Sequence, residues 1–267
     1  MSDWGKAIVN SIDWGKSATN SIDWGNIYDN SLAGDTLLVQ SGFVNTHSVD
    51  FDGVNDYMEV TPYASLDGAT SFSISFWIYP VEDTFTRYAL LLDSTTTPIK
   101  FIYRGGNKQM DLNITTTGFF ARTSTNSMPL NQWTHVVWTF DGSQSRYNKY
   151  QVYINGQLDS FADAGSNESA LGNFTSLDLG MWVAANSAYE GGFDEFAIYK
   201  NTILSQADAD TIYNSGVPND LNNNGLTVPT NWWRFEEGSG TSVTDSGSAG
   251  DNGTLINGAV YSTNVPT

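Results

Sequence analysis

Two neighbouring segments decide the fold: residues 191–200 read GGFDEFAIYK, and residues 204–216 read LSQADADTIYNSG. The first is rich in aromatic and β-branched residues, which predicts a strand over Phe193–Tyr199. The second predicts a short helix, because Ser205 can cap its start, Ile212 then faces inward and Gly216 can end it. One short helix directly after a strand, in a chain otherwise rich in strand patterns, indicates an all-β fold.

Short strand patterns recur from about residue 34 onward, separated by clusters of Gly, Asn, Asp and Ser, and this spacing is typical of a β-sandwich. In residues 71–79 the apolar side chains at alternate positions share one face, so Trp77 and Tyr79 lie on the opposite face. The expected strands are Thr36–Gln40, Thr46–Phe51, Asp56–Val60, Ser71–Tyr79, Tyr88–Leu92, Ile99–Arg104, Asp111–Thr115, Gln132–Phe140, Tyr150–Ile154, Ser176–Trp182 and Gly192–Tyr199.

Five segments carry a family resemblance: residues 49–60 (VDFDGVNDYMEV), 71–78 (SFSISFWI), 131–142 (NQWTHVVWTFDG), 150–157 (YQVYINGQ) and 191–216. Together, and in this order, they resemble a laminin G-like domain of the concanavalin A-like lectin/glucanase superfamily. The resemblance implies a concanavalin/laminin G-like antiparallel β-sandwich, or jelly roll, with one short helix. The pair Asn155-Gly156 fits the tight turn of a hairpin, because both residues tolerate positive φ.

Residues 217–267 contain NWWRFEEGSGT at 231–241, which resembles the start of such a domain, although it stands at the end here. The segment either completes the same sandwich, as in a permuted domain, or is a truncated second copy. We favour completion, because about fifty residues cannot bury a sandwich core alone. The expected organisation is an N-terminal arm at residues 1–30 and one sandwich at residues 31–267.

The arm carries a repeat with a period of ten: SDWGK at residues 2–6, SIDWGK at 11–16 and SIDWGN at 21–26. Ten residues are too few to cover Trp4, Trp14 and Trp24, and exposed apolar surface costs about 25 cal/mol per Å². We therefore expect these rings to pack on the sandwich or to anchor the arm in a partner or a sister copy. The favoured interpretation is an extended anchoring arm, and the alternative is a disordered or strand-swapped leader.

The chain is strongly acidic, with 29 Asp and Glu residues against 11 Lys and Arg residues and a net charge of −18. This charge repels phosphates and anionic lipids, so we expect no nucleic-acid partner and no membrane partner. There is no cysteine, which excludes disulfides, and no apolar run long enough to span a membrane as a helix. Such acidity suits an extracellular protein in salty water, and plain solubility explains it equally well.

Acid–base catalysis on such a sandwich needs two carboxylates on one face of the sheet. Asp194 and Glu195 are adjacent in a strand, so we expect their side chains on opposite faces of the sheet. Glu236 and Glu237 are also adjacent, and the same expectation holds for them. His135 lies within an apolar run, which predicts a core residue and not a base. We therefore expect the protein not to be an enzyme, and a glycan-cleaving enzyme remains the less favoured class.

A calcium site is expected at Asp220, Asn222 and Asn224, which match the first positions of an EF-type loop, with Ca²⁺ as the one cofactor considered. The twelfth position is Asn231, where a bidentate Glu is expected, so a plain turn is the alternative. Asp245 with residues 251–252 forms a second candidate, which a tight turn explains equally well.

Exposed aromatic rings beside amides and carboxylates are suited to carbohydrate, because rings stack on sugar faces and polar groups hold hydroxyls. The expected glycan-binding loop contains Trp182, Asn186, Tyr189 and Glu190, and core packing is the alternative role of Trp182.

We expect a non-catalytic virion structural or attachment protein of a bacteriophage, with a fibre, decoration or host-surface glycan-binding role. The repeats resemble N-terminal segments of bacteriophage structural proteins, the N-terminus lacks a basic-then-apolar signal segment, and no catalytic pair is evident. Other virion proteins would hold the arm, a host-surface glycan would be the ligand, and the protein would form a homo-oligomer. The alternative is a carbohydrate-binding adhesin domain that is secreted or lies on a bacterial cell surface.

Overall fold

The computed structural model describes residues 43–267 apart from 83, 85, 95, 115–119, 123–126, 146–147, 160–168 and 183–186. The chain divides into two units, residues 1–42 and 43–267, and the described residues belong to the second. The tryptophans of the repeat, Trp4, Trp14 and Trp24, and the expected strand Thr36–Gln40 therefore lie outside the described residues.

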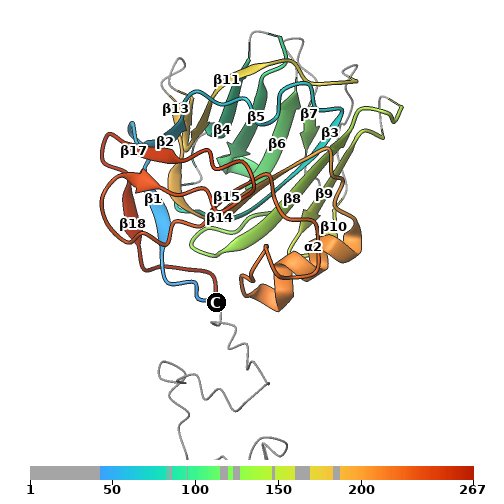
Figure 1. Ribbon diagram of the computed structural model, residues 1–267. Helices are drawn as coiled ribbons and strands as arrows, with labels where there is room; N and C mark the ends of the chain where they lie inside the picture. The colour runs from blue at the N-terminus through green and yellow to red at the C-terminus, as the bar shows by residue number, and fades with distance from the viewer. Residues whose placement is uncertain are drawn as a thin grey trace, which may run out of the picture. The chain divides into compact units, whose positions relative to one another are not determined.

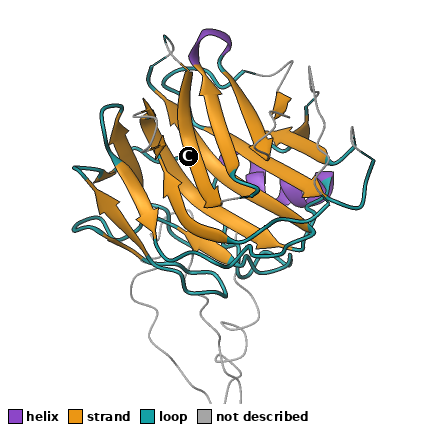
Figure 2. Cartoon of the chain, turned by 90° about the horizontal axis from the view of Figure 1, so that it is seen from above, coloured by secondary structure: helices purple, strands orange, loops and turns teal. Residues whose placement is uncertain are grey.

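The described unit is a sandwich of two antiparallel sheets, which Figures 1 and 2 show as two facing layers of strands. The first sheet has the order β10 (Gln157–Leu158), β9 (Tyr150–Ile154), β8 (Thr134–Asp141), β3 (Ser71–Pro80), β14 (Glu190–Lys200), β1 (Ser48–Asp52) and β18 (Val260–Ser262), and β15 (Asn231–Trp233) also pairs with β14. The second sheet has the order β16 (Ser242–Val243), β17 (Gly253–Ile256), β2 (Tyr57–Val60), β11 (Phe174–Leu179), β4 (Thr86–Ser94), β5 (Ile99–Arg104), β6 (Gln109–Ile114) and β7 (Phe120–Arg122).

The expected fold class is confirmed, and the strands Ile99–Arg104 and Tyr150–Ile154 have the expected bounds. The strand expected over 176–182 is instead two: β11 ends at Leu179, and β12 (Met181–Trp182) pairs with β13 (Ser187–Ala188) in a small ribbon. Gly180 makes this break, because its φ of +101° is accessible to glycine and a Cβ there would come within 2.9 Å of the Phe51 ring.

The core lies between the sheets and is built largely from aromatic side chains. On β3 the alternate residues 72, 74, 76 and 78 are all buried in it, as their spacing predicts. The ring of Phe76 lies at its centre, with centroids 5.7 Å from Phe101, 5.5 Å from Phe193 and 6.0 Å from Phe196. Such pairs contribute about 0.5–1.5 kcal/mol each beyond their buried area.

Helix α2 (Gln206–Tyr213) covers part of the outer face of the first sheet (Figure 1). Ser205 caps it as predicted, in a capping box with Asp208, and Ile212 is buried against Val137 and Tyr199 of the sheet. The expected end at Gly216 is corrected: Asn214 ends the helix in the left-handed region, and a 3₁₀ turn over Asn214–Gly216 follows.

The C-terminal segment supplies strands to both sheets: β15 pairs with β14, β17 with β2, and β18 with β1. A buried polar network fixes its course. The Asp245 carboxylate accepts four hydrogen bonds, from Asn231 Nδ2 and from the backbone N–H groups of residues 232, 247 and 251, at 2.6–2.8 Å. Asn231 Oδ1 in turn accepts a hydrogen bond from the Tyr63 hydroxyl at 3.1 Å.

We expect Asp245→Ala to lower the free energy of unfolding by about 3–5 kcal/mol, because the backbone N–H groups of residues 232, 247 and 251 would lose their carboxylate acceptor. Asp220→Ala, in a solvent-facing turn, is the matched control and should cost about 1 kcal/mol or less. Urea unfolding followed by tryptophan fluorescence measures both. Equal losses for the two variants would contradict this role of Asp245.

Candidate functional site: an uncharged aromatic cavity

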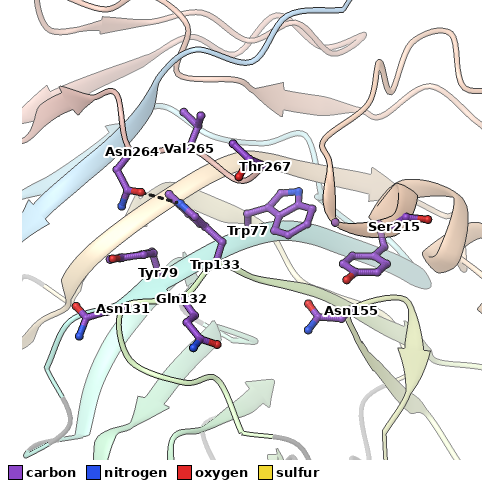
Figure 3. A pocket seen from close by; sticks show the side chains of 12 residues that line it. Trp77, Tyr79, Asn131, Gln132, Trp133, Asn155, Ser215, Asn264, Val265 and Thr267 are labelled. Carbon is purple, nitrogen blue, oxygen red and sulfur yellow. Dashed lines mark hydrogen bonds between the residues drawn. The ribbon is translucent and has the colours of Figure 1, made fainter.

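A cavity of about 500 Å³ opens on the outer face of the first sheet, beside the end of α2. Aromatic rings from the sheet and the helix form it together with side-chain amides (Figure 3). Its lining residues are Trp77, Tyr79, Asn131, Gln132, Trp133, Asn155, Tyr213, Ser215, Gly216, Asn264, Val265 and Thr267.

Strand alternation places the central rings. Because the even-numbered positions of β3 point into the core, Trp77 and Tyr79 project from its outer face, as the sequence predicts. Trp133 directly precedes β8, the neighbour of β3. The N–H of Asn131 donates to the carbonyl of Pro80 at 2.8 Å and holds this loop against the end of β3.

The inner wall is a cluster of three rings. Trp77 is 3% exposed, and its ring centroid lies 5.7 Å from Tyr213 and 5.0 Å from His135. His135 is buried beneath, with Nε2 2.9 Å from Ser75 Oγ, so the expectation of a core residue is confirmed. Burial lowers the pKa of His135 to about 3, so the imidazole is neutral at physiological pH and adds no charge behind the cavity.

The outer wall is formed by Trp133 and the last residues of the sequence. The Trp133 ring lies 5.3 Å from that of Tyr79, and its Nε1 donates to Asn264 Oδ1 at 3.3 Å, the dashed line in Figure 3. The carbonyl of Asn264 accepts a hydrogen bond from Ser48 Oγ at 2.7 Å. These two hydrogen bonds hold Asn264 against the sheet, and Val265 and Thr267 beside it also line the cavity.

The polar groups of the cavity are amides and hydroxyls. Asn155 has a φ of +49° in the predicted hairpin turn, and its Oδ1 accepts the His135 N–H at 2.9 Å, which leaves its NH₂ group as the donor for a ligand. Asn131 and Gln132 are exposed at the rim. Among the described residues that line the cavity, none has a charged side chain. The arrangement can stack rings on a ligand and bind its hydroxyls, but it offers no carboxylate pair for acid–base catalysis.

The expected glycan-binding loop does not form this site. Tyr189 is 1% exposed and packs in the core against Phe193 with a centroid distance of 5.2 Å, so its ring is not available to a ligand. Trp182 is half-buried, with the Lys100 ammonium 4.1 Å above its ring. Glu190 begins β14 opposite Asp52 of β1. Asn186 lies outside the described residues.

The expected calcium loop is closed by its own hydrogen bonds. Asp220 accepts from the Asn222 N–H at 3.0 Å and from Asn223 Nδ2 at 2.7 Å, and Asn224 Oδ1 accepts from the Leu226 N–H at 3.0 Å. These contacts are those of a turn. At the second candidate, the oxygens of Asp245 are all engaged in the network described above. Within the described ranges, no group of three or more His, Cys, Asp or Glu side chains is arranged to hold a metal ion.

The expectation that Asp194 and Glu195 point to opposite faces is wrong, because β14 contains a bulge. Asp194 pairs with Trp77 and Ala197 with Ser75, so Glu195 and Phe196 together oppose one residue of β3. Glu195 has a φ of +49°, and Phe196 enters the core in its place. Both carboxylates therefore lie on the outer side of the sheet.

This carboxylate pair is closed off from solvent. Asp194 accepts from Asn45 Nδ2 at 2.9 Å and from the Glu195 N–H at 2.8 Å. Glu195 accepts from Trp232 Nε1 at 2.6 Å and lies 3.4 Å from Arg234 Nε. The two residues are 0% and 4% exposed, and the void beside Glu195 is about 10 Å³, which leaves room for about one water and no substrate.

We expect Asp194→Asn to reduce the loss of stability at alkaline pH. Burial raises the pKa of Asp194 well above its usual range and that of Glu195 to about 8. Because both pKa values are raised in the folded state, the stability that the protonated carboxyls contribute is complete below about pH 4 and is lost as pH rises through the folded-state pKa values, which for Glu195 is about 8. The variant removes one of the two ionisations and the repulsion between the charges. Urea unfolding from pH 5 to pH 9 measures this.

Asp210→Asn, on the exposed side of α2, is the matched control and should keep the wild-type pH profile. An unchanged profile for Asp194→Asn would contradict the assignment of this pH dependence to the buried pair.

Only part of the cavity could be predicted from the sequence. Trp77 and Tyr79 are recognisable as an outward aromatic pair on one strand. Trp133 and Asn264 give no such signal, because they meet only through the antiparallel pairing of β3 with β8 and the return of the chain end.

The chain belongs to the concanavalin A-like lectin/glucanases superfamily, whose family model matches residues 52–209. A search of the curated proteins finds no match to the sequence. No helix among the described residues is long and apolar enough to cross a membrane.

Several solved structures are similar to this chain at low sequence identity. A protein from Bacteroides ovatus described as carbohydrate-binding is 14% identical, with a TM-score of 0.60, and the match covers 84% of this chain and 62% of that one. A heptameric SAP-like pentraxin from Limulus polyphemus is 13% identical, with a TM-score of 0.49, covering 63% and 82%. The CBM40 domain of a Ruminococcus gnavus sialidase, bound to α2,3 sialyllactose, is 10% identical, with a TM-score of 0.47, covering 62% and 96%.

Proposed function

We propose that this protein is a non-catalytic glycan-binding module whose aromatic cavity binds a neutral saccharide. The observation that carries the proposal is the composition of the cavity: four aromatic rings, of which Trp77 is almost fully buried and the other three are partly exposed, four side-chain amides and no charged side chain among its described lining residues. Sugar faces are apolar and stack on aromatic rings, and sugar hydroxyls both donate and accept hydrogen bonds, as amides do. The family description, which joins lectins and glucanases, is consistent with a saccharide ligand.

The absence of charge selects the saccharide class. A sialylated or sulfated sugar carries an anion, which proteins usually bind through Arg or Lys. The described lining of this cavity contains neither. Neutral hexose-containing oligosaccharides match the available donors and acceptors without leaving a desolvated anion unpaired.

We expect Trp133→Ala to weaken binding of a neutral oligosaccharide at least tenfold, because aromatic anchors of this kind contribute roughly 2 kcal/mol or more. Trp133 is only half-buried, so its loss should leave the fold intact. Screening on a glycan array followed by isothermal titration calorimetry of the best neutral ligand measures the effect.

Trp182→Ala is the matched control, since Trp182 is also half-buried but lies outside the cavity. It should bind as the wild type does. A preference for the sialylated form of the same oligosaccharide would contradict the neutral class, and equal losses in both variants would contradict the cavity. Appearance of new reducing ends during long incubation would contradict the non-catalytic role.

As the setting of this activity we propose attachment of a bacteriophage particle to host-surface glycans, with a bacterial cell-surface adhesin as the alternative. The support is the repeat with its three tryptophans, which gives the sandwich an arm for anchoring to other virion proteins or to sister copies.

If the arm joins sister copies, replacing Trp4, Trp14 and Trp24 together by Ala should turn a homo-oligomer into a monomer, because the anchors of the arm are removed. Sedimentation velocity of both proteins measures the mass. A wild-type protein that is already monomeric, or a variant that stays oligomeric, would contradict self-association through these residues.

A further inference from the structure

A second cluster of polar side chains lies on the outer face of the second sheet, separate from the cavity. Asp178 is flanked in β11 by Leu177 and Leu179, which are both 0% exposed in the core, so its side chain points outward. Glu59 of β2 and Asp93 of β4 also alternate with core residues and point outward. Three carboxylates on three adjacent strands therefore share this face.

The strand register places these side chains next to one another. Asp178 is directly opposite Glu59 across the β2–β11 pair, and directly opposite Leu91 across the β4–β11 pair. Asp93 is opposite Ser176, which makes it a diagonal neighbour of Asp178. Side chains directly opposite in an antiparallel pair have Cβ atoms about 4.5–5.5 Å apart, and diagonal neighbours about 7–8 Å.

Two features of this arrangement are unfavourable in the protein alone. Like charges directly opposite one another repel. In addition, Asp178 is only 7% exposed, and its Oδ1 has no hydrogen-bond partner in the described part of the chain. Buried polar atoms in native proteins are nearly always partnered, and a carboxylate oxygen is among the most costly to leave without one.

The nearby ammonium group of Lys100 forms no ion pair with the facing carboxylates and no hydrogen bond with Asp178 Oδ1. Lys100 of β5 is opposite Leu91, one strand beyond Asp178, and its ammonium lies over the Trp182 ring. Among the ion pairs of the described residues, none involves Asp178, Glu59 or Asp93. A single bound cation would neutralise the facing pair and supply the missing partner of Oδ1.

We propose that Asp178 and Glu59 bind a calcium ion on the outer face of the second sheet, with Asp93 contributing through water. Carboxylate oxygens are the ligands of hard cations, and Ca²⁺ tolerates irregular geometry and an incomplete protein shell, whereas Mg²⁺ demands near-ideal octahedral coordination. No His or Cys belongs to the cluster, which argues against zinc. This site differs from the loop at residues 220–224, where the side-chain oxygens of Asp220 and Asn224 accept hydrogen bonds within the turn.

The number of ligands sets the affinity. Because the described residues hold no group of three carboxylates at direct ligand spacing, two carboxylates and water would hold the ion. A dissociation constant of about 10⁻⁴–10⁻³ M, the range of extracellular calcium modules, is expected.

The test is terbium luminescence, with calcium alone as the competitor, on the full chain at pH 7.5. Tyr57 lies near the carboxylates on β2 and can sensitise the bound terbium ion. Calcium at about 10 mM should displace terbium and raise Tm by roughly 3 °C over the value in a chelator. Asp178→Asn should weaken binding at least tenfold and abolish the Tm shift, and Glu59→Gln should act in the same direction.

Asp220→Asn is the control variant and should keep both signals. If it alone loses them, the ion binds the loop and the proposal is wrong. Calcium-insensitive Tm in the wild type would also overturn it. All of these outcomes are independent of saccharide binding, because the site lies on the other sheet.

Discussion

The bulge at Glu195 is the constraint on which the arrangement of the first sheet depends. Strand β14 pairs with β3 along one edge, but its other edge serves two strands: β1 before the bulge, through residues 190–193, and β15 after it, through residues 196–198. A bulge increases the local twist and bends the strand, so the two partners diverge at this point. The sheet therefore forks, and the fork brings together the start and the end of the domain.

Polar side chains fill the fork and connect segments that are far apart in sequence. Arg234 donates from Nη2 to the Val44 carbonyl at 2.6 Å, and Glu236 accepts from the Thr46 N–H, the Thr46 hydroxyl and the His47 N–H at 2.7–3.1 Å. Phe43 stacks on Trp232 with a centroid distance of 6.2 Å. The chain that enters the sandwich is thus held by its C-terminal segment, which gives residues 231–236 a structural role beyond that of an added edge strand.

Local features of the fold could be predicted from the sequence, and features created by pairing could not. Strand alternation around Phe76, the cap at Ser205 and the turn at Asn155 depend on a few consecutive residues. The bulge depends on how many residues of β3 oppose those of β14, and the cavity depends on residues 77, 133, 213 and 264 meeting in space. The prediction that Tyr189 binds glycan is wrong for the same reason. Its ring packs in the core beside Tyr103 of the second sheet, and this contact cannot be predicted from the residues next to Tyr189 in the sequence.

The two proposed sites differ in charge and lie on opposite faces of the sandwich, and the short range of electrostatic interactions in salt makes this placement matter. At physiological ionic strength, charges are screened beyond about 8 Å, so the net charge of the protein barely affects a ligand already seated in the cavity. Discrimination between neutral and anionic saccharides must then come from groups in contact with the ligand, and the described lining has no charged side chain. The carboxylates of Asp178 and Glu59 lie on the opposite sheet, where a cation can neutralise them without placing charge beside the cavity. Because the saccharide cavity and the cation site lie on opposite faces of the sandwich, the cavity can remain free of charged side chains while the cation site keeps its carboxylates.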